Sequence, residues 1–72
     1  MGGHLIKRSF TLAGHRTSVA LEPEFWAVLE EAAAQRGEPL LRLVAAADAS
    51  RDDPELPLAS ALRVLALGLV RR

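Results

Sequence analysis

The sequence predicts a small, mostly helical domain that contains one short β-strand. Hydrophobic and polar residues alternate between Thr17 and Leu21, which is the period of a half-buried strand. Three later segments, 23–36, 38–49 and 58–70, carry apolar residues at the spacing of amphipathic or buried helices. Half of the 72 residues are hydrophobic but only 4% are aromatic, and such a composition, rich in Leu, Ala and Val, suits packed helices.

Length and residue usage limit the classes of protein to which this chain can belong. A single core in 72 residues is only marginally stabilising, so we expect an oligomer. The chain has no cysteine, which excludes disulfides and cysteine-based zinc or redox sites. His4 and His15 are the only imidazoles, and no further ligands stand at a metal-like spacing, so we expect neither a metal nor another cofactor.

The charges of this neutral chain are unevenly distributed. Residues 1–17 hold Lys7, Arg8 and Arg16 without any acid, whereas residues 18–72 hold 6 basic and 9 acidic side chains. The local charges of +3 and −3 cancel in the sum. A basic amino-terminal face on an acidic body predicts contact with a polyanion such as nucleic acid.

We expect residues 1–15 to form a flexible basic arm, followed by one domain at 16–72. Apolar residues alternate with polar ones in segment 7–12, which is compatible with a short strand. Ala13-Gly14 then predicts a turn, because glycine adopts positive φ at no steric cost. The arm could therefore fold back on the following strand.

That strand has two faces of different character. Thr17, Val19 and Leu21 share the apolar face. The opposite face consists of Arg16, Ser18 and Ala20 and can meet a partner. The strand ends at Glu22, where Pro23 suits the first turn of a helix.

The first predicted helix, 23–36, should end at Gly37 in a left-handed conformation. Its core face is predicted to consist of Phe25, Val28, Leu29 and Ala32. Consecutive helical residues point about 100° apart, so we expect Phe25 in the core and Trp26 at its edge.

The second predicted helix begins at Glu38-Pro39 and reaches Ala49, and a polar loop with solvated acids follows at 48–57. The third helix, 58–70, is apolar nearly all round and must be covered on more than one side. A second protomer is the covering surface that we expect.

We expect no enzymatic activity. The chain lacks a nucleophile elbow and any phosphate-binding glycine motif, and the neighbouring carboxylates Glu30-Glu31 and Asp52-Asp53 fall on predicted solvent-facing surface. No uncharged span reaches 18 residues, and the amino terminus lacks the apolar core of a signal sequence. We therefore expect a cytoplasmic protein without a membrane partner.

Four segments carry a resemblance to a known family. They are Lys7-Arg8-Ser9, Ala13 to Glu22, Phe25-Trp26 and Ser60-Ala61-Leu62-Arg63. They resemble the ribbon-helix-helix superfamily of Arc- and MetJ-like DNA-binding proteins, and in particular its bacterial branch of small stand-alone domains. The resemblance implies an intertwined homodimer in which one strand of each protomer forms a two-stranded antiparallel ribbon, with an extra C-terminal helix added. It also implies a transcriptional regulator that inserts the ribbon into the major groove of double-stranded DNA.

The resemblance further implies roles for individual residues. The base-facing residues would be Arg16, Ser18 and Ala20. The phosphate-contacting residues would be Lys7, Arg8, His15 and the start of the second helix at Pro39, Leu40 and Leu41. The dimer core would contain Val19, Leu21, Phe25, Val28, Leu29, Ala32, Leu40 and Val44.

Two departures from the family pattern leave an alternative open. Ser18 and Ala20 are short where the family usually has long polar side chains, and Glu38-Pro39 stands where a small hydroxyl residue is common. Glu38 would repel a phosphate, and Pro39 has no N–H to donate. The alternative is a protein–protein interaction module, or an antitoxin-like protein, that keeps the dimer without sequence-specific DNA binding. Its partner protein could bind the C-terminal helix.

Overall fold

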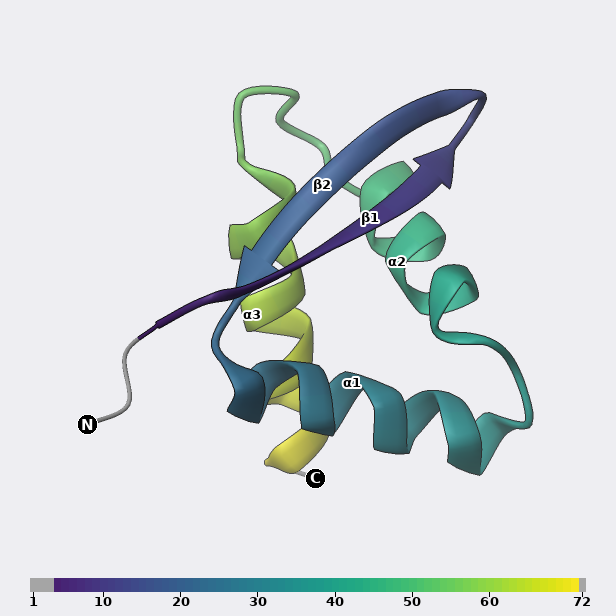
Figure 1. Ribbon diagram of the computed structural model, residues 1–72, viewed down its shortest axis with the longest axis vertical. Helices are drawn as coiled ribbons and strands as arrows, with labels where there is room; N and C mark the ends of the chain where they lie inside the picture. The colour runs from purple at the N-terminus through teal and green to yellow at the C-terminus, as the bar shows by residue number, and fades with distance from the viewer. Residues whose placement is uncertain (1–3, 72) are drawn as a thin grey trace.

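The computed structural model of the chain describes residues 4–71. Two strands are followed by three helices, so the predicted fold class, mostly helical with a short β-ribbon, is confirmed (Figure 1). The elements are β1 Ile6–Leu12, β2 His15–Leu21, α1 Pro23–Arg36, α2 Leu40–Ala49 and α3 Leu58–Val70.

Strands β1 and β2 form an antiparallel hairpin within one chain. Their register runs from Leu12 opposite His15 to Ile6 opposite Leu21. The two turn residues both have positive φ, 51° at Ala13 and 82° at Gly14, as in the two-residue turns that match the twist of a hairpin. The short strand considered for residues 7–12 and its return at the Ala13-Gly14 turn are confirmed, since β1 of the same chain lies beside β2. Pairing of β2 with a second protomer, which the resemblance implied, stays a prediction.

The turn offers a test of this hairpin, because a non-glycine residue rarely adopts positive φ. Asparagine tolerates this conformation better than alanine and gives the favoured Asn-Gly turn. We expect Ala13→Asn to raise the free energy of unfolding by about 0.5–1 kcal/mol and the melting temperature by ~2–8 °C. Thermal unfolding followed by circular dichroism measures the shift. An unchanged or lower melting temperature would argue against the hairpin turn.

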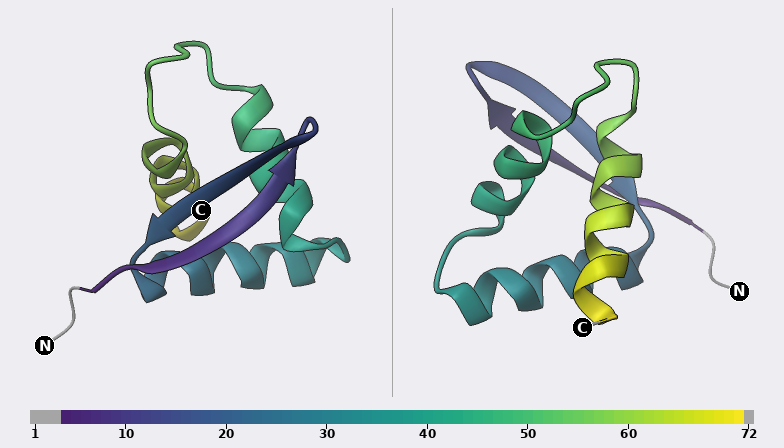
Figure 2. Two further views of the ribbon diagram at one scale, coloured as in Figure 1. Left: turned by 45° about the horizontal axis from the view of Figure 1, so that its top comes forward. Right: turned by 180° about the vertical axis from the view of Figure 1, so that it is seen from behind.

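The hairpin covers one side of a frame made by the three helices (Figure 2). Apolar side chains from the strands and the helices meet between these two layers. This main core consists of Leu12, Val19, Leu21, Trp26, Leu29, Val44, Ala47, Leu58, Leu62 and Ala66. Within residues 4–71, no polar or charged residue is fully buried. The small chain thus has a purely apolar core between ribbon and helices.

The boundaries of α1 and α2 follow from local backbone chemistry. Gly37 has φ 67° and ends α1, its N–H donating to the carbonyl of Ala34 at 3.1 Å. The N–H of Glu38 donates to the carbonyl of Ala33 at 3.0 Å, which completes a glycine-dependent helix end. Helix α2 begins at Leu40, and Pro39 precedes it in an extended conformation. The predicted start at Glu38-Pro39 is therefore two residues too early.

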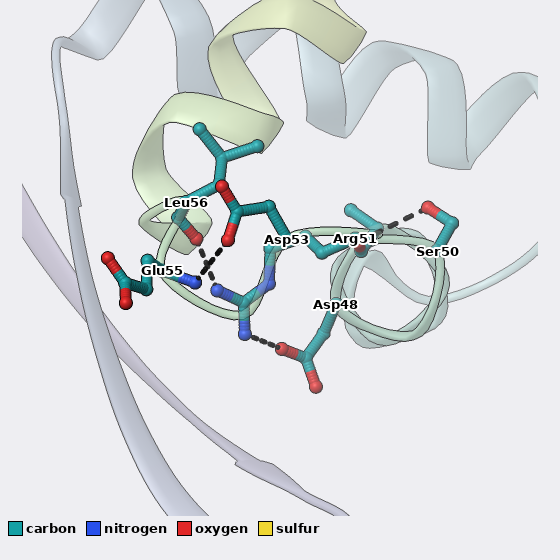
Figure 3. Close-up of polar contacts among 7 residues, drawn as sticks. Asp48, Ser50, Arg51, Asp53, Glu55 and Leu56 are labelled. Carbon is teal, nitrogen blue, oxygen red and sulfur yellow. Dashed lines mark hydrogen bonds and ion pairs between the residues drawn. The ribbon is translucent and has the colours of Figure 1, made fainter.

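The segment between α2 and α3 is held by Arg51 (Figure 3). One guanidinium nitrogen donates to the carboxylate of Asp48 at 2.7 Å, and another donates to the carbonyl of Leu56. The Asp53 carboxylate accepts a hydrogen bond from the backbone N–H of Glu55 at 2.9 Å. These contacts fix how the chain enters α3.

Candidate nucleic-acid interface

The side of the hairpin that faces away from the helices carries hydroxyl groups and two cations. Strand residues alternate between faces, so the paired positions in the register place one set of six side chains outward. We call this set the outward ribbon face; it consists of Lys7, Ser9, Thr11, Arg16, Ser18 and Ala20. All of its members except the half-buried Ala20 are exposed, and the hydroxyl oxygens of Ser9 and Ser18 lie 2.9 Å apart.

The charge of this face has one sign. No acidic residue occurs between Ile6 and Leu21, so the cations Lys7 and Arg16 have no carboxylate on either strand. His15 is also exposed, next to the turn. Guanidinium, ammonium and hydroxyl groups are the donors with which proteins contact phosphates and base edges.

Trp26 attaches the ribbon to α1. Its indole N–H donates to the backbone carbonyl of Ile6 at 2.8 Å, and its ring centroid lies 6.0 Å from that of Phe10. Only 2% of Trp26 is exposed, whereas Phe25 is half-buried. The expectation that Phe25 fills the core and Trp26 lies at its edge is therefore wrong. The reason is that β1 crosses the start of α1 and covers the tryptophan.

Arg8 lies on the helix-facing side of the hairpin. Its guanidinium carbon is 4.9 Å from the centroid of the Trp26 ring, and it forms an ion pair with Glu30 of α1. The alternation of β1 thus separates Arg8 from its neighbour Lys7 on the outward ribbon face. Lys7 and Arg8 were both expected to contact phosphates. Only Lys7 lies on the same face of the hairpin as Arg16.

A second contact joins the end of the ribbon to α3. The Nε of Arg63 donates to the carboxylate of Glu22 at 3.1 Å, and the guanidinium lies 5.9 Å from the centroid of Phe25. A hydrogen bond from its own backbone, followed by the bond from Arg63, holds the pKa of Glu22 below its ordinary value of 4.5. Glu22 is therefore ionised where β2 passes into α1.

The remaining predicted site residues lie elsewhere. Pro39, Leu40 and Leu41 stand at the start of α2, beside the end of α1 and away from the hairpin turn (Figure 1). Among the residues expected in a dimer core, those buried within one chain are Val19, Leu21, Leu29, Ala32 and Val44. The other three, Phe25, Val28 and Leu40, are half-buried.

Sequence reasoning missed Ser9 and Thr11 as members of the outward ribbon face. Their place depends on the pairing of Ser9 with Ser18 and of Thr11 with Arg16, which a single-strand pattern does not reveal. The sequence did contain a sign of this pairing. Apolar and polar residues alternate over 7–12, directly before the Ala13-Gly14 turn, which is the pattern of the first strand of a hairpin.

Together, the hairpin and the three helices define a small helical domain with an outward antiparallel ribbon. A ribbon-helix-helix domain model matches residues 5–70, so the chain belongs to the ribbon-helix-helix domain family, which in general comprises non-enzymatic DNA-binding regulators. Comparisons with curated proteins and with solved structures gave no match. Within residues 4–71, no helix has the length and apolar character needed to span a bilayer.

Proposed function

We propose that this chain is a cytoplasmic, homodimeric transcriptional regulator whose outward ribbon face enters the major groove of DNA. The observation that carries the proposal is the acid-free hairpin, on which Lys7 and Arg16 share one exposed face with three hydroxyl side chains. The family membership supports DNA binding in general.

The dimensions of the hairpin suit this groove. Two paired strands lie about 4.8 Å apart, and the major groove is about 12 Å wide, so a two-stranded ribbon fits with its side chains. Seven residues of strand extend over about 23 Å, which is less than one helical turn of DNA. One hairpin can therefore contact several successive base pairs.

The roles of the side chains follow from their reach. Arg16 is the longest donor on β2 and can make two parallel hydrogen bonds to a guanine edge. Lys7 lies at the opposite end of the face and acts as a point charge for a phosphate. The hydroxyls of Ser9, Thr11 and Ser18 can donate to or accept from either a phosphate or a base.

Duplex binding over a range of salt concentrations tests the proposal. If the four cations that Lys7 and Arg16 of two chains bring to the DNA displace the counterions of roughly 4 phosphates, log K should fall with log salt with a slope of about −4. Lys7→Ala should make the slope shallower by about 2, because two phosphate contacts are lost per dimer. The control is Arg36→Ala, which removes an exposed cation at the end of α1, away from the ribbon. Absence of binding to any duplex at ~50 mM salt would refute DNA binding.

The short side chains of Ser18 and Ala20 favour a second candidate function. They leave Arg16 as the single long donor of β2 on the outward ribbon face. A protein–protein interaction module or antitoxin-like protein would keep the fold and lack sequence-specific DNA binding. Selection of bound sequences from a random duplex pool separates the two candidates: an enriched motif supports the regulator, and none supports the module.

A further inference from the structure

Helix α3 has an apolar face that no other described part of the chain covers. Leu58, Leu62 and Ala66 are buried on its inner side. Val64, Leu67 and Val70 are exposed, and Val64, at 69%, is the most exposed of the large hydrophobic residues within 4–71. In Figure 2, right, α3 lies at the side of the helical frame with the hairpin behind it. Exposed apolar side chains that share one side of a helix are typical of an interaction surface.

A hollow beside this face adds a complementary shape. It has a volume of about 600 Å³, lies between α2 and α3, and opens to solvent. Seven apolar residues line it, together with five polar or charged ones. The apolar residues are Leu43, Ala46, Ala47, Leu56, Ala61, Val64 and Leu65, and the others are Arg36, Ser50, Arg51, Asp52 and Asp53. The same side of the molecule thus carries projecting apolar side chains and a recess, which is what a self-complementary two-fold contact needs.

The charges at the two ends of α3 have opposite signs. Asp52 and Glu55 precede its first turn, and Arg71 follows its last turn. None of these three side chains has an ion-pair partner within the described part of the chain. A second α3 that runs antiparallel places its Arg71 beside these acids, and the reciprocal pair forms at the other end.

We propose that a second copy of this chain covers the outward face of α3, with the two α3 helices antiparallel and Val64 on the two-fold axis. The register follows from placing Arg71 of one helix beside Pro57 of the other. In an antiparallel pair with two-fold symmetry, the axis then passes through the position midway between 57 and 71, which is 64. Leu67 then lies opposite the partner's Ala61, which lines the hollow. Gly68 lies opposite the partner's Ser60, so small residues let the helices approach. This inference rests on the proposed function, which includes a homodimer, and it identifies the surface through which the two chains meet.

Sedimentation equilibrium of the intact chain tests this contact. The wild type should be a dimer at micromolar concentration. Val64→Glu should raise the dimer dissociation constant by about 100-fold or more, because two carboxylates would face each other across the axis. The matched control, Leu41→Glu, changes an exposed leucine on α2 and should leave the constant unchanged. Circular dichroism should give the same helix content for both variants.

Chemical cross-linking provides a second measurement that does not depend on destabilising the contact. The chain has no cysteine, so Val64→Cys introduces a single thiol. A short thiol-to-thiol cross-linker should join two Val64→Cys chains efficiently and two Leu41→Cys chains poorly. A dimer that persists in Val64→Glu, or equal cross-linking of both cysteine variants, would overturn the α3 contact.

Duplex binding measured in parallel separates this inference from the proposed function. A wild-type dimer that dissociates on Val64→Glu but binds no duplex supports the α3 contact and refutes DNA binding. A dimer that binds duplex but is insensitive to Val64→Glu refutes the contact alone. A wild type that is monomeric at micromolar concentration refutes both the contact and the homodimer.

Discussion

Replacing Trp26 with alanine is expected to lower the free energy of unfolding by about 3–5 kcal/mol. The indole is 2% exposed, packs near Phe10 and donates its N–H to the backbone of Ile6. Its removal opens a cavity between β1 and α1 and leaves that carbonyl without its partner. A loss of this size is a large fraction of the stability of a 72-residue domain. Urea unfolding followed by circular dichroism measures it.

Two control variants separate the contribution of the buried ring of Trp26 from that of its hydrogen bond. Trp26→Phe keeps an aromatic ring but removes the donor to Ile6, so it should cost less than the alanine variant. Phe25→Ala removes a half-buried ring and should cost only about 1–2 kcal/mol. If Phe25→Ala proved more destabilising than Trp26→Ala, the position of β1 over α1 would be contradicted.

The second large effect concerns DNA affinity. We expect Arg16→Ala to weaken binding to a selected duplex by roughly 30-fold or more, because a dimer would lose two contacts of about 1–3 kcal/mol each. Arg16→Lys keeps the charge but not the planar pair of donors. It should preserve the salt dependence and reduce the preference for the selected sequence over random duplex. Fluorescence anisotropy with both duplexes measures the two quantities.

The outcome distinguishes base contact from phosphate contact. If Arg16 binds only a phosphate, lysine should retain most of the affinity and all of the sequence preference. Arg36→Ala, outside the ribbon, should change neither quantity by more than about twofold. Unchanged binding in Arg16→Ala would contradict a role of this side chain in DNA contact.

Features that depend on neighbouring residues were predictable from the sequence. Pro23 and Gly37 mark the ends of α1, and the spacing of apolar residues located all three helices. A proline in the first turn and a glycine after the last act through the local backbone, so their effect does not depend on the rest of the fold.

Features that depend on distant segments were not predictable in the same way. The burial of Trp26 requires β1, and the ion pair of Arg8 requires Glu30 on another element. The position of Ser9 on the outward ribbon face depends on its pairing with Ser18 of the other strand. A single-strand pattern gives the alternation of side chains but not which strand will lie beside it.

The closure of the hairpin within one chain has a consequence for how binding depends on concentration. A ribbon assembled from two chains exists only above the dimer dissociation constant, whereas this ribbon is complete in a single molecule. Dilution of the proposed dimer would therefore separate the chains and leave the outward ribbon face of each chain intact. Occupancy of a site would then follow stepwise mass action, in which a first bound chain raises the effective concentration of the second.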